Sequence, residues 1–411
     1  MAHLIFANPA GTEEKIAWMQ RDAAYDVADN DDALIPDLSL IKETVRAKKN
    51  PPKVPKVFLS NDCIFNCAYC GCRNGRDCQR YASTPRELAK LAVEQAEENR
   101  HGIFVTSSIY KNADYTEELI VETLRIIRNE IGYQGYVHAK IMPGADPRLI
   151  YQAGRYADRL SVNIEVAKSE GYEKIARNKN RTNILTPMHQ ISEMIAAAKR
   201  EKSRFAPKFA VSQTTQLMAG STQESDKTIL TLSNALYAKY RLKRVYYTPF
   251  QYRHEAAGYE GLPLVSTPRW RMHRLYQADR LMQLYGFTPD EITPDDHPFL
   301  SENLDPKAAW ALRHLDLFPV EVNRADYETL LRVPGIGVTY AARILKARKY
   351  CTITHSVLKA LGVSLKRSRH FITCNGVFEG VTCDNDDTLR PYLTELIDWK
   401  SQQTDLLSVA I

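Results

Sequence analysis

The sequence predicts an α/β protein in which parallel βα units come first and a mainly helical region follows. Short apolar runs alternate with amphipathic helical patterns from Lys56 to Tyr285, and the alternation stops at a Pro- and Asp-rich segment, Thr288 to Pro298. Strands that alternate with helices imply parallel pairing through crossover helices. The units could close into a partial (β/α)6 barrel or form an open doubly wound sheet. In both, ligands bind at the carboxyl ends of the strands.

Each expected element has its own signal. The first strand is the apolar run Lys56–Ser60, and Thr84-Pro-Arg-Glu87 then has the capping box and N1 proline that begin a helix. Five more apolar runs predict strands at 102–107, 136–142, 159–166, 209–218 and 244–250. Apolar residues at helical spacing, with proline or acidic residues at several starts, predict helices at 116–130, 146–156, 186–199, 226–240 and 267–285.

Length and composition limit the class of protein. The chain has 411 residues, more than one core usually supports, so at least two domains are expected. Its hydrophobic fraction of 44% and charged fraction of 25% are ordinary for a globular protein. No apolar run reaches the roughly 18 residues that span a bilayer, and the N-terminus lacks the pattern of a signal peptide. We therefore expect a cytoplasmic protein with no membrane partner.

The cysteines are unevenly distributed. Five of the eight lie between Cys63 and Cys78, and in a long chain without an export signal such crowding favours metal or cluster binding over disulfides. Cys63, Cys67 and Cys70 have the spacing C-x3-C-x2-C. Three thiolates on a tight loop can ligate three irons of a [4Fe–4S] cubane and leave the fourth iron open. An open metal position is what allows a site to do chemistry.

Two other metal sites are alternatives. A zinc ion could take Cys72 or Cys78 as a fourth ligand beside the three cysteines of the motif. A second cluster could use these two with the cysteines of the C-terminal region, although no recognised spacing supports it. Those cysteines are Cys351, Cys374 and Cys383.

Polar residues follow three of the expected strands with a period of two. Alternate residues of a barrel strand point inward, and buried polar groups are costly unless they are paired, so this pattern indicates a polar cavity. The polar residues are His138 and Lys140 on one strand, Ser161, Asn163 and Glu165 on the next, and Ser212, Thr214 and Gln216 on a third. Lys140 and His138 are the candidates for residues that face a substrate.

The cysteine motif resembles the signature of the radical S-adenosylmethionine (SAM) superfamily, because Tyr69 precedes the third cysteine and the loop directly follows the first strand. The resemblance implies a partial (β/α)6 TIM-like radical SAM barrel. It also implies that SAM chelates the open iron, that an electron donor such as flavodoxin or ferredoxin reduces the cluster, and that a 5′-deoxyadenosyl radical forms.

The resemblance also implies residues that bind SAM. The second strand of the superfamily often ends in a Gly-Gly-Glu-like segment, whereas this sequence has Thr106-Ser-Ser108, so hydroxyls and backbone carbonyls would have to serve. The cofactor-binding candidates are Tyr69, Ser107, Ser108, Asn163, Glu165, Gln216 and Gly220. For each of them, a hydrogen bond that only lines the barrel is the alternative role.

The C-terminal region carries the basic character of the chain. The stretch Thr329 to Phe378 has no Asp or Glu and nine Lys or Arg, and the remainder has 46 basic against 49 acidic residues. A local excess of this kind is typical of a surface that binds a polyanion. A solvated basic face without a partner is the alternative.

The same region predicts a helical hairpin. Tyr327–Arg332 and Tyr340–Arg348 read as helices, and Val333-Pro-Gly-Ile-Gly337 lies between them. Glycines in such a turn allow close approach to a phosphate, which the N–H groups of the next helix can then bind. The hairpin resembles the helix-hairpin-helix motif, which binds the nucleic-acid backbone without reading sequence. The nucleic-acid-binding candidates are Gly335, Ile336, Gly337, Arg343, Lys346 and Arg348. A structural helix corner is the alternative.

From about residue 15 to 380 the chain resembles a family of DNA modification or repair radical SAM proteins, which join a radical SAM barrel to a C-terminal helix-hairpin-helix domain. The runs that match include 63–73, 157–165, 273–279, 318–348 and 361–375. The residue patterns, together with this resemblance, predict these segments: an N-terminal extension at 1–50, the barrel at 51–287, a linker at 288–318, the helix-hairpin-helix domain at 319–375 and a helical tail at 376–411.

The family resemblance implies hydrogen abstraction from a nucleic acid, with DNA the expected polymer, in repair or modification. A uracil-DNA-glycosylase-like protein is an expected partner, because members of the family are typically encoded beside one. A base inside a duplex is out of reach, so the target nucleotide would have to be flipped or single-stranded. Two alternatives remain: a radical SAM enzyme for tRNA, and a nucleic-acid-binding protein whose cluster senses redox state without catalysis.

Overall fold

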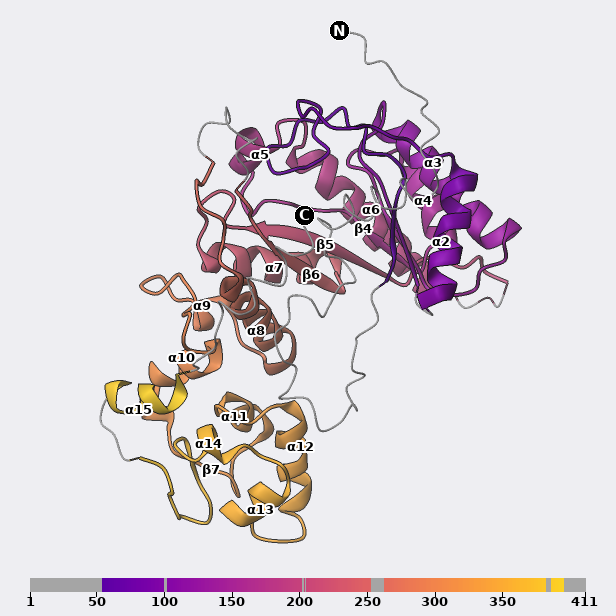
Figure 1. Cartoon of the computed structure of the whole chain (residues 1–411). Helices are drawn as coiled ribbons and strands as arrows, with labels where there is room; N and C mark the ends of the chain where they lie inside the picture. Colours follow the sequence, from indigo (N-terminus) through magenta and orange to yellow (C-terminus); the bar gives the residue numbers. More distant parts are fainter. Residues whose placement is uncertain are drawn as a thin grey trace. The chain divides into compact units, whose positions relative to one another are not determined.

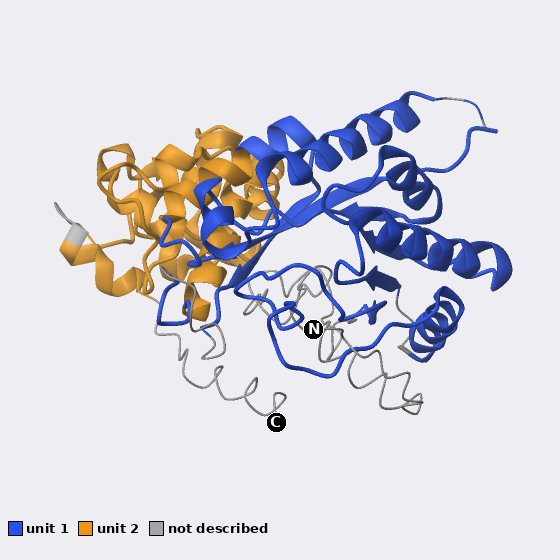
Figure 2. Ribbon diagram, turned by 90° about the horizontal axis from the view of Figure 1, so that it is seen from above, with its two compact units in different colours: residues 1–224, 235–267 blue, residues 225–234, 268–411 orange. Residues whose placement is uncertain are grey.

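The computed structural model describes residues 54–99, 102–201, 203, 205–252, 262–381 and 386–394, so the expected extension at 1–50 lies outside the described residues. Two compact units are present. Of the described residues, the first unit contains those up to Glu224 and those within Ala235–Thr267, and the second contains Ser225–Asn234 and those from Pro268 onward (blue and orange in Figure 2).

A six-stranded parallel sheet forms the centre of the first unit (Figure 1). Its strands are β1 (Lys56–Phe58), β2 (Ile103–Thr106), β3 (Val137–Lys140), β4 (Arg159–Ser161), β5 (Ser212–Ala219) and β6 (Arg244–Pro249). They pair in the order of the sequence, so every crossover runs in the same direction, and right-handed crossovers then place all the helices on one face. The sheet is therefore singly wound, like part of a (β/α) barrel, and the doubly wound alternative is wrong.

Helices cover the outer face of this sheet. They are α2 (Pro85–Asn99), α3 (Ala113–Arg125, continued by the π-helix Ile126–Glu130), α4 (Pro147–Tyr156) and α6 (Arg181–Arg200). Two further helices are α5 (Glu170–Ile175), which precedes α6 in the chain, and α7 (Asp226–Tyr240), whose residues are divided between the two units. α2 packs against α3, α3 against α4 and α4 against α6, as neighbours in a barrel do. Apolar side chains of the strands and helices fill the layer between them, including Ile103, Val105, Ile120 and Leu124, all fully buried.

Helix α6 begins earlier than the sequence indicates. Its N-cap is Asn180, which forms a reciprocal capping box with Asn183, and Pro187 lies inside the helix instead of at its start. A proline cannot donate to the carbonyl four residues earlier. That carbonyl, of Asn183, accepts the backbone N–H of Gly144 at 2.8 Å instead. The expected start at 186–187 is wrong because this tertiary contact compensates for the missing bond, and α5 was not expected at all.

The second unit is mainly helical. Its elements are α8 (Arg269–Tyr285), α9 (Pro289–Ile292), α10 (Pro306–Leu312), the 3₁₀ turn Leu315–Leu317, α11 (Tyr327–Arg332), α12 (Val338–Ala347), α13 (His355–Ala360), α14 (Leu365–Ser368) and α15 (Asp386–Leu393). Two short parallel strands, β7 (Val320–Glu321) and β8 (Ile372–Thr373), join the two ends of the region that contains the hairpin.

The segment 288–318 is not a free linker. It contains α9 and α10, and Trp310 of α10 packs edge-on against the rings of Phe287 and Phe318. The prolines and acidic residues that indicated a linker are helix starts, since Thr288 and Asp305 are N-caps followed by proline. The same residue types favour both structures, so composition alone could not separate them. Helix α8, expected in the barrel domain, also belongs to the second unit.

No helix in the described part of the chain is both long and apolar enough to cross a bilayer.

Glu117 on α3 gives a test of this packing. Burial raises the pKa of its carboxyl to about 8, although the N–H of Met142 donates to it at 2.9 Å and thereby lowers the pKa. The folded chain therefore keeps a proton that the unfolded chain loses above its ordinary pKa of 4.5, and stability falls as pH rises from there toward 8. Glu117→Gln should be more stable than wild type near pH 8, and the advantage should shrink toward about pH 5.

Urea denaturation midpoints at the two pH values measure this difference, with Glu118→Gln, an exposed neighbour on the same helix, as the control. Equal pH dependence in wild type and Glu117→Gln would contradict the burial of this carboxyl.

Candidate functional site

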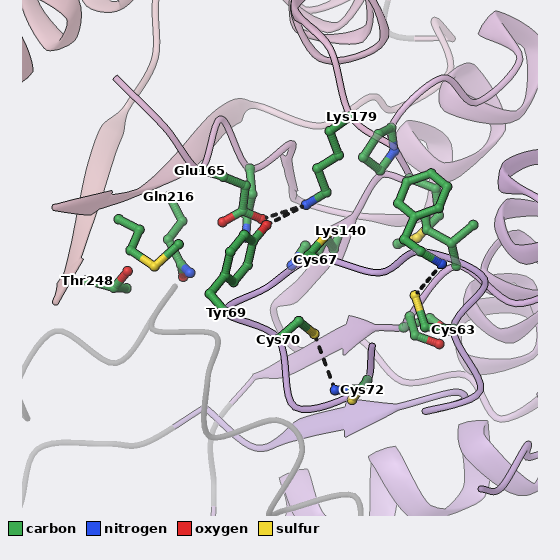
Figure 3. A pocket seen from close by; sticks show the side chains of 18 of the residues that line it. Cys63, Cys67, Tyr69, Cys70, Cys72, Lys140, Glu165, Lys179, Gln216 and Thr248 are labelled. Carbon is green, nitrogen blue, oxygen red and sulfur yellow. Dashed lines mark hydrogen bonds and ion pairs between the residues drawn. The ribbon is translucent and has the colours of Figure 1, made fainter. Parts of the chain in front are cut away.

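A cavity lies at the carboxyl ends of the strands in the first unit (Figure 3). Each strand, or the loop directly after it, supplies at least one lining residue: in order, Phe58, Ser108, Lys140, Glu165, Gln216 and Thr248. The three cysteines of the C-x3-C-x2-C motif and Cys72 line the same cavity. The structure thus brings the cysteine loop and the polar ends of the strands together.

Backbone hydrogen bonds from two other loops fix the cysteine loop. Ile64 donates to the carbonyl of Ile109 after β2 at 2.9 Å, and Ala68 donates to the carbonyl of Ile175 at the end of α5 at 2.8 Å. Within the loop, Cys70 donates to the carbonyl of Cys67 at 3.0 Å, which closes the turn between the second and third cysteines. The sulfurs are therefore positioned by the barrel and not by the loop alone.

Arg80 fixes the segment that follows the third cysteine. Its guanidinium donates to four backbone carbonyls: those of Asn61 at 2.6 Å, Cys72 at 2.8 Å, Arg73 at 2.6 Å and Arg76 at 2.9 Å. The first acceptor follows β1, and the other three belong to the loop after the motif. One side chain thus ties both ends of the cysteine loop together, a role that no sequence pattern indicated.

The donor set fits a cubane cluster. Cys63 and Cys67 are buried, Cys70 is partly buried, and all three face one cavity. Each thiolate of such a cluster binds a different iron, so the sulfurs need to surround a volume. Among the described residues, no group of three or more His, Cys, Asp or Glu side chains is placed to hold a metal ion. The seven described cysteines are free thiols, and Cys383 lies outside the described residues.

The thiols differ in acidity. Burial raises the pKa of Cys67 to about 12, and the positive charge of Lys179 opposes that rise. Burial likewise raises the pKa of Cys63. A hydrogen bond from the side chain of Cys72 lowers the pKa of Cys70 to about 6, and the backbone N–H of Cys72 also donates to its sulfur at 3.4 Å (Figure 3). Because metals bind thiolates, Cys70 is the sulfur best prepared as a ligand.

Lys179 is the main residue that sequence reasoning missed. It lies between α5 and α6, and its ammonium contacts Glu165 Oε1 at 2.9 Å and the hydroxyl of Tyr69 at 3.1 Å (Figure 3). Burial lowers the pKa of Lys179, but the charges of Glu165 and Cys67 outweigh burial and raise it. The lysine is therefore a fixed cation beside the cysteines. It stands in the polar run Arg177-Asn-Lys-Asn-Arg181, which resembles an ordinary surface loop in sequence.

Glu165 has a left-handed backbone conformation, with φ of 63°. This conformation is strained for a residue other than glycine. Strand β5 holds it, because Glu165 donates its N–H to the carbonyl of Gln216 at 2.9 Å and accepts the N–H of Met218 at 2.8 Å. In this conformation the carboxylate of Glu165 accepts a hydrogen bond from Lys179.

Two hydroxyls at the cavity have no protein partner. Ser107 Oγ and Ser108 Oγ are buried without a hydrogen bond, and both residues line the cavity. Native structures leave few buried hydroxyls unsatisfied, so such groups indicate a water or a ligand. They lie directly after β2, where the sequence indicated that hydroxyls would replace the usual SAM-binding segment.

Most of the residues proposed from the sequence lie at this cavity. Its lining includes Tyr69, Ser107, Ser108, Lys140, Asn163, Glu165 and Gln216. Gly220 is outside the lining and instead forms the turn after β5, with φ of 85° and its N–H bound to the carboxylate of Glu224. His138 is also outside the lining: it is fully buried, and its ring stacks on Phe104 with centroids 4.2 Å apart. His138 therefore faces no substrate in this structure.

The hairpin in the second unit forms as α11, a turn and α12. Ile336 is buried in the turn, and Gly335 has φ of 86°, so a side chain there would be strained. The turn already has internal partners. Lys307 donates to the carbonyl of Ile336 at 2.5 Å, and the hydroxyl of Tyr285 accepts the N–H of Val338, the first residue of α12.

The basic residues of the hairpin divide into two groups. Arg343 donates to the carbonyl of Leu361 at 3.0 Å and Arg348 to that of Ala325 at 2.5 Å, and both are partly buried. Lys346, and Lys349 beyond it, are exposed. The two arginines thus have structural contacts, and the lysines are the residues that a polyanion could reach.

No protein-family model and no curated protein matches this chain. Among solved structures, it is similar to two of the FeFe-hydrogenase maturase HydG, one of them from Carboxydothermus hydrogenoformans. Their identities are 14% and 17%, with a TM-score of 0.41 over 56% of this chain. It is also similar to methylornithine synthase (PylB), at 15% identity and a TM-score of 0.43 over 66% of this chain and 75% of that one.

This chain spans about half the length of the two maturases, 51% and 49%.

The buried ion pair gives a stability test. The Lys179 and Glu165 side chains are 12% and 6% exposed, so Lys179→Met leaves a buried carboxylate without its partner, which costs roughly 3 to 5 kcal/mol of unfolding free energy. Adding Glu165→Gln should recover much of that loss, because the remaining group is neutral. Chemical denaturation of both single variants and the double variant measures the coupling.

The exposed Lys174→Met on α5 is the matched control and should change little. Additive losses in the double variant would contradict a direct Lys179–Glu165 interaction.

Proposed function

We propose that this chain is a radical SAM enzyme that holds a [4Fe–4S] cluster with Cys63, Cys67 and Cys70, and that its substrate is a nucleic acid, preferentially DNA. The observation that carries the enzyme proposal is the cavity at the carboxyl ends of six parallel strands, which the three cysteines line together with two serines whose hydroxyls have no protein partner. When bound, the cluster and SAM would supply one-electron reductive cleavage and a 5′-deoxyadenosyl radical for hydrogen abstraction.

The residues of the chain hold and orient these groups. Ser107 and Ser108 would offer hydroxyls to the amino group of SAM, and Asn163 and Gln216 would offer amides to its ribose and adenine. Lys179 holds Glu165 and Tyr69 in place and offsets the negative charge of the thiolates. Ile109 and Met142 contribute apolar side chains to the lining of the site.

The radical SAM proposal is tested by product formation. Anaerobically reconstituted wild-type protein, given dithionite and SAM, should form 5′-deoxyadenosine. Cys67→Ala should form none, since one of three cluster ligands is missing. Cys351→Ala, which removes an exposed cysteine of the second unit, should match wild type.

Iron and sulfide in the wild type without any 5′-deoxyadenosine, with or without added nucleic acid, would contradict catalysis and favour a sensing cluster. Zinc in place of iron, in protein isolated without oxygen, would contradict the cluster itself.

The nucleic-acid proposal rests on the second unit. The sequence of the hairpin is similar to a helix-hairpin-helix, and the acid-free stretch 329–378 has exposed lysines at Lys346, Lys349, Lys359 and Lys366. Exposed cations that outnumber anions on one segment bind the phosphate backbone and release counterions. Lys307 and Tyr285 already bind part of the hairpin turn, so we assign most of the contact with phosphate to the lysines.

Charge reversal tests this proposal. Lys346→Glu/Lys349→Glu should weaken binding to a DNA duplex. The slope of log affinity against log salt concentration should become less steep by about two, because each lysine neutralises one phosphate. Lys90→Glu/Lys174→Glu, two exposed positions in the first unit, changes net charge equally and should leave affinity nearly intact. Fluorescence anisotropy over a salt series measures both.

Equal loss in the two double variants would show that binding follows net charge and not this surface. Tighter binding of tRNA than of duplex DNA at fixed salt would favour RNA as the substrate.

A further inference from the structure

The end of α12 presents an aromatic ring to solvent. Tyr350 follows the last residue of that helix by three positions and is 82% exposed, the largest value among the large apolar side chains that the structure describes. No described residue stacks on its ring, places a cation over it or hydrogen-bonds to its hydroxyl. Such a ring leaves apolar area in water that a flat partner could cover. The contacts within the hairpin do not explain its position.

The segment that carries Tyr350 is fixed on both sides. Before it, the guanidinium of Arg348 donates to the carbonyl of Ala325 at 2.5 Å. After it, the N–H of Ile353 donates to Asn323 Oδ1 at 2.8 Å, and the amide of Asn323 donates back to the carbonyl of Ile353 at 3.0 Å. The backbone beneath the ring is therefore held in place before any partner binds. A partner that stacks on a ring held in this way loses less affinity to the ordering of the chain.

Two lysines share a face with this ring. The helical path continues past the end of α12, because Tyr350 donates its N–H to the carbonyl of Ala347 at 2.9 Å. Residues three and four apart on a helix are neighbours, so Lys346, Lys349 and Tyr350 lie along one side. Ile344, on the opposite side, is fully buried. Both lysines are exposed, and neither has an acidic partner among the described residues. The exposed side of this helix end thus combines two ammonium groups with one ring.

This combination fits a nucleic-acid strand with unpaired bases. The surface lies within the stretch 329–378, which has no Asp or Glu, so its charge favours a polyanion. Each nucleotide supplies both a phosphate for a lysine and a flat base for the ring. In a duplex, neighbouring bases cover the faces of each base, whereas the bases of a single strand can stack on an exposed aromatic side chain. The lysines alone suit either form of nucleic acid, and the ring favours the single strand.

We propose that Lys346, Lys349 and Tyr350 form a binding surface for single-stranded nucleic acid, in which Tyr350 stacks on an unpaired base and the two lysines bind the flanking phosphates. This inference rests on the proposed nucleic-acid substrate and adds the form of the strand. Contacts with phosphate position a protein on nucleic acid without reading its bases. Chemistry on a base requires that the base be unpaired, and a surface of this kind selects regions where unpaired bases are available.

Fluorescence anisotropy at one fixed salt concentration tests the inference, with a labelled oligodeoxythymidylate strand and the same strand paired to oligodeoxyadenylate as probes. Tyr350→Ala should weaken binding of the single strand about tenfold and leave binding of the duplex nearly unchanged. Tyr350→Phe and Tyr350→Trp keep a flat ring and should retain the affinity for the single strand. Tyr151→Ala, which removes a tyrosine exposed on α4, is the control and should match wild type on both probes. Thermal denaturation of each variant shows that it is folded.

Equal loss on the two probes in Tyr350→Ala, or the same loss in Tyr350→Phe as in Tyr350→Ala, would overturn stacking on an unpaired base. No loss on either probe would also overturn it and would leave the ring to a different partner, such as an acidic protein segment. These outcomes are separate from the failure of the proposed function. Wild-type protein that binds neither probe refutes the nucleic-acid substrate, whereas binding that Lys346→Glu/Lys349→Glu weakens and Tyr350→Ala does not refutes the stacking surface alone.

Discussion

The arrangement of the site depends on the hydrogen bonds and the ion pair that the ammonium of Lys179 forms with Tyr69 and Glu165. The ammonium connects three segments that are distant in sequence: Tyr69 of the cysteine loop, Glu165 after β4, and the connection between α5 and α6. Two buried charges are stable only when geometry and additional hydrogen bonds compensate for lost solvation. Here the ammonium also lowers the pKa of the thiols of Cys67 and Cys70, which the charge of Glu165 raises. The ion pair thus couples the fold of the barrel to the state of the cysteines.

Several features of the barrel are unfavourable in free energy, and packing alone does not explain them. Glu165 has a left-handed backbone, and hydroxyls on or just after three strands are buried without partners. Costs of this kind persist where function requires them. They occur on the inner face of the sheet and at the carboxyl ends of its strands, where a parallel barrel binds its ligands. The distribution of strain and unsatisfied groups therefore agrees with the position of the cysteines.

Much of the fold could be predicted from periodicity. The six strands and most helices of the first unit follow from apolar patterns, and the alternation of Ser161, Asn163 and Glu165 correctly indicated an inward polar face. The start of α6 was mispredicted because a tertiary contact at Asn183 replaces the helical hydrogen bond that Pro187 cannot form. The segment that begins at Thr288 was mispredicted as a linker because proline and acidic residues are common both in linkers and at the starts of helices.

The site was predictable to the extent that residues lie in a motif or on a strand. The cysteines and the strand ends belong to these classes. Lys179 and Arg80 do not, since their roles come from hydrogen bonds to segments that only the fold brings near. His138 shows the opposite error: it has the period of an inward residue, but it lies one layer below the cavity and stacks on Phe104. The alternation of residues along a strand predicts which face of the sheet a side chain points to, but it does not predict whether that side chain reaches the cavity.

The most direct test of the central claim is the electron paramagnetic resonance spectrum of the dithionite-reduced protein, recorded before and after addition of SAM. Three cysteine ligands leave one iron open. We predict a reduced [4Fe–4S] signal whose g values shift when SAM is added, with the signal lost in Cys67→Ala. A reduced cluster whose spectrum is unchanged by saturating SAM would contradict an open iron, and with it the account of the cavity as a radical SAM site.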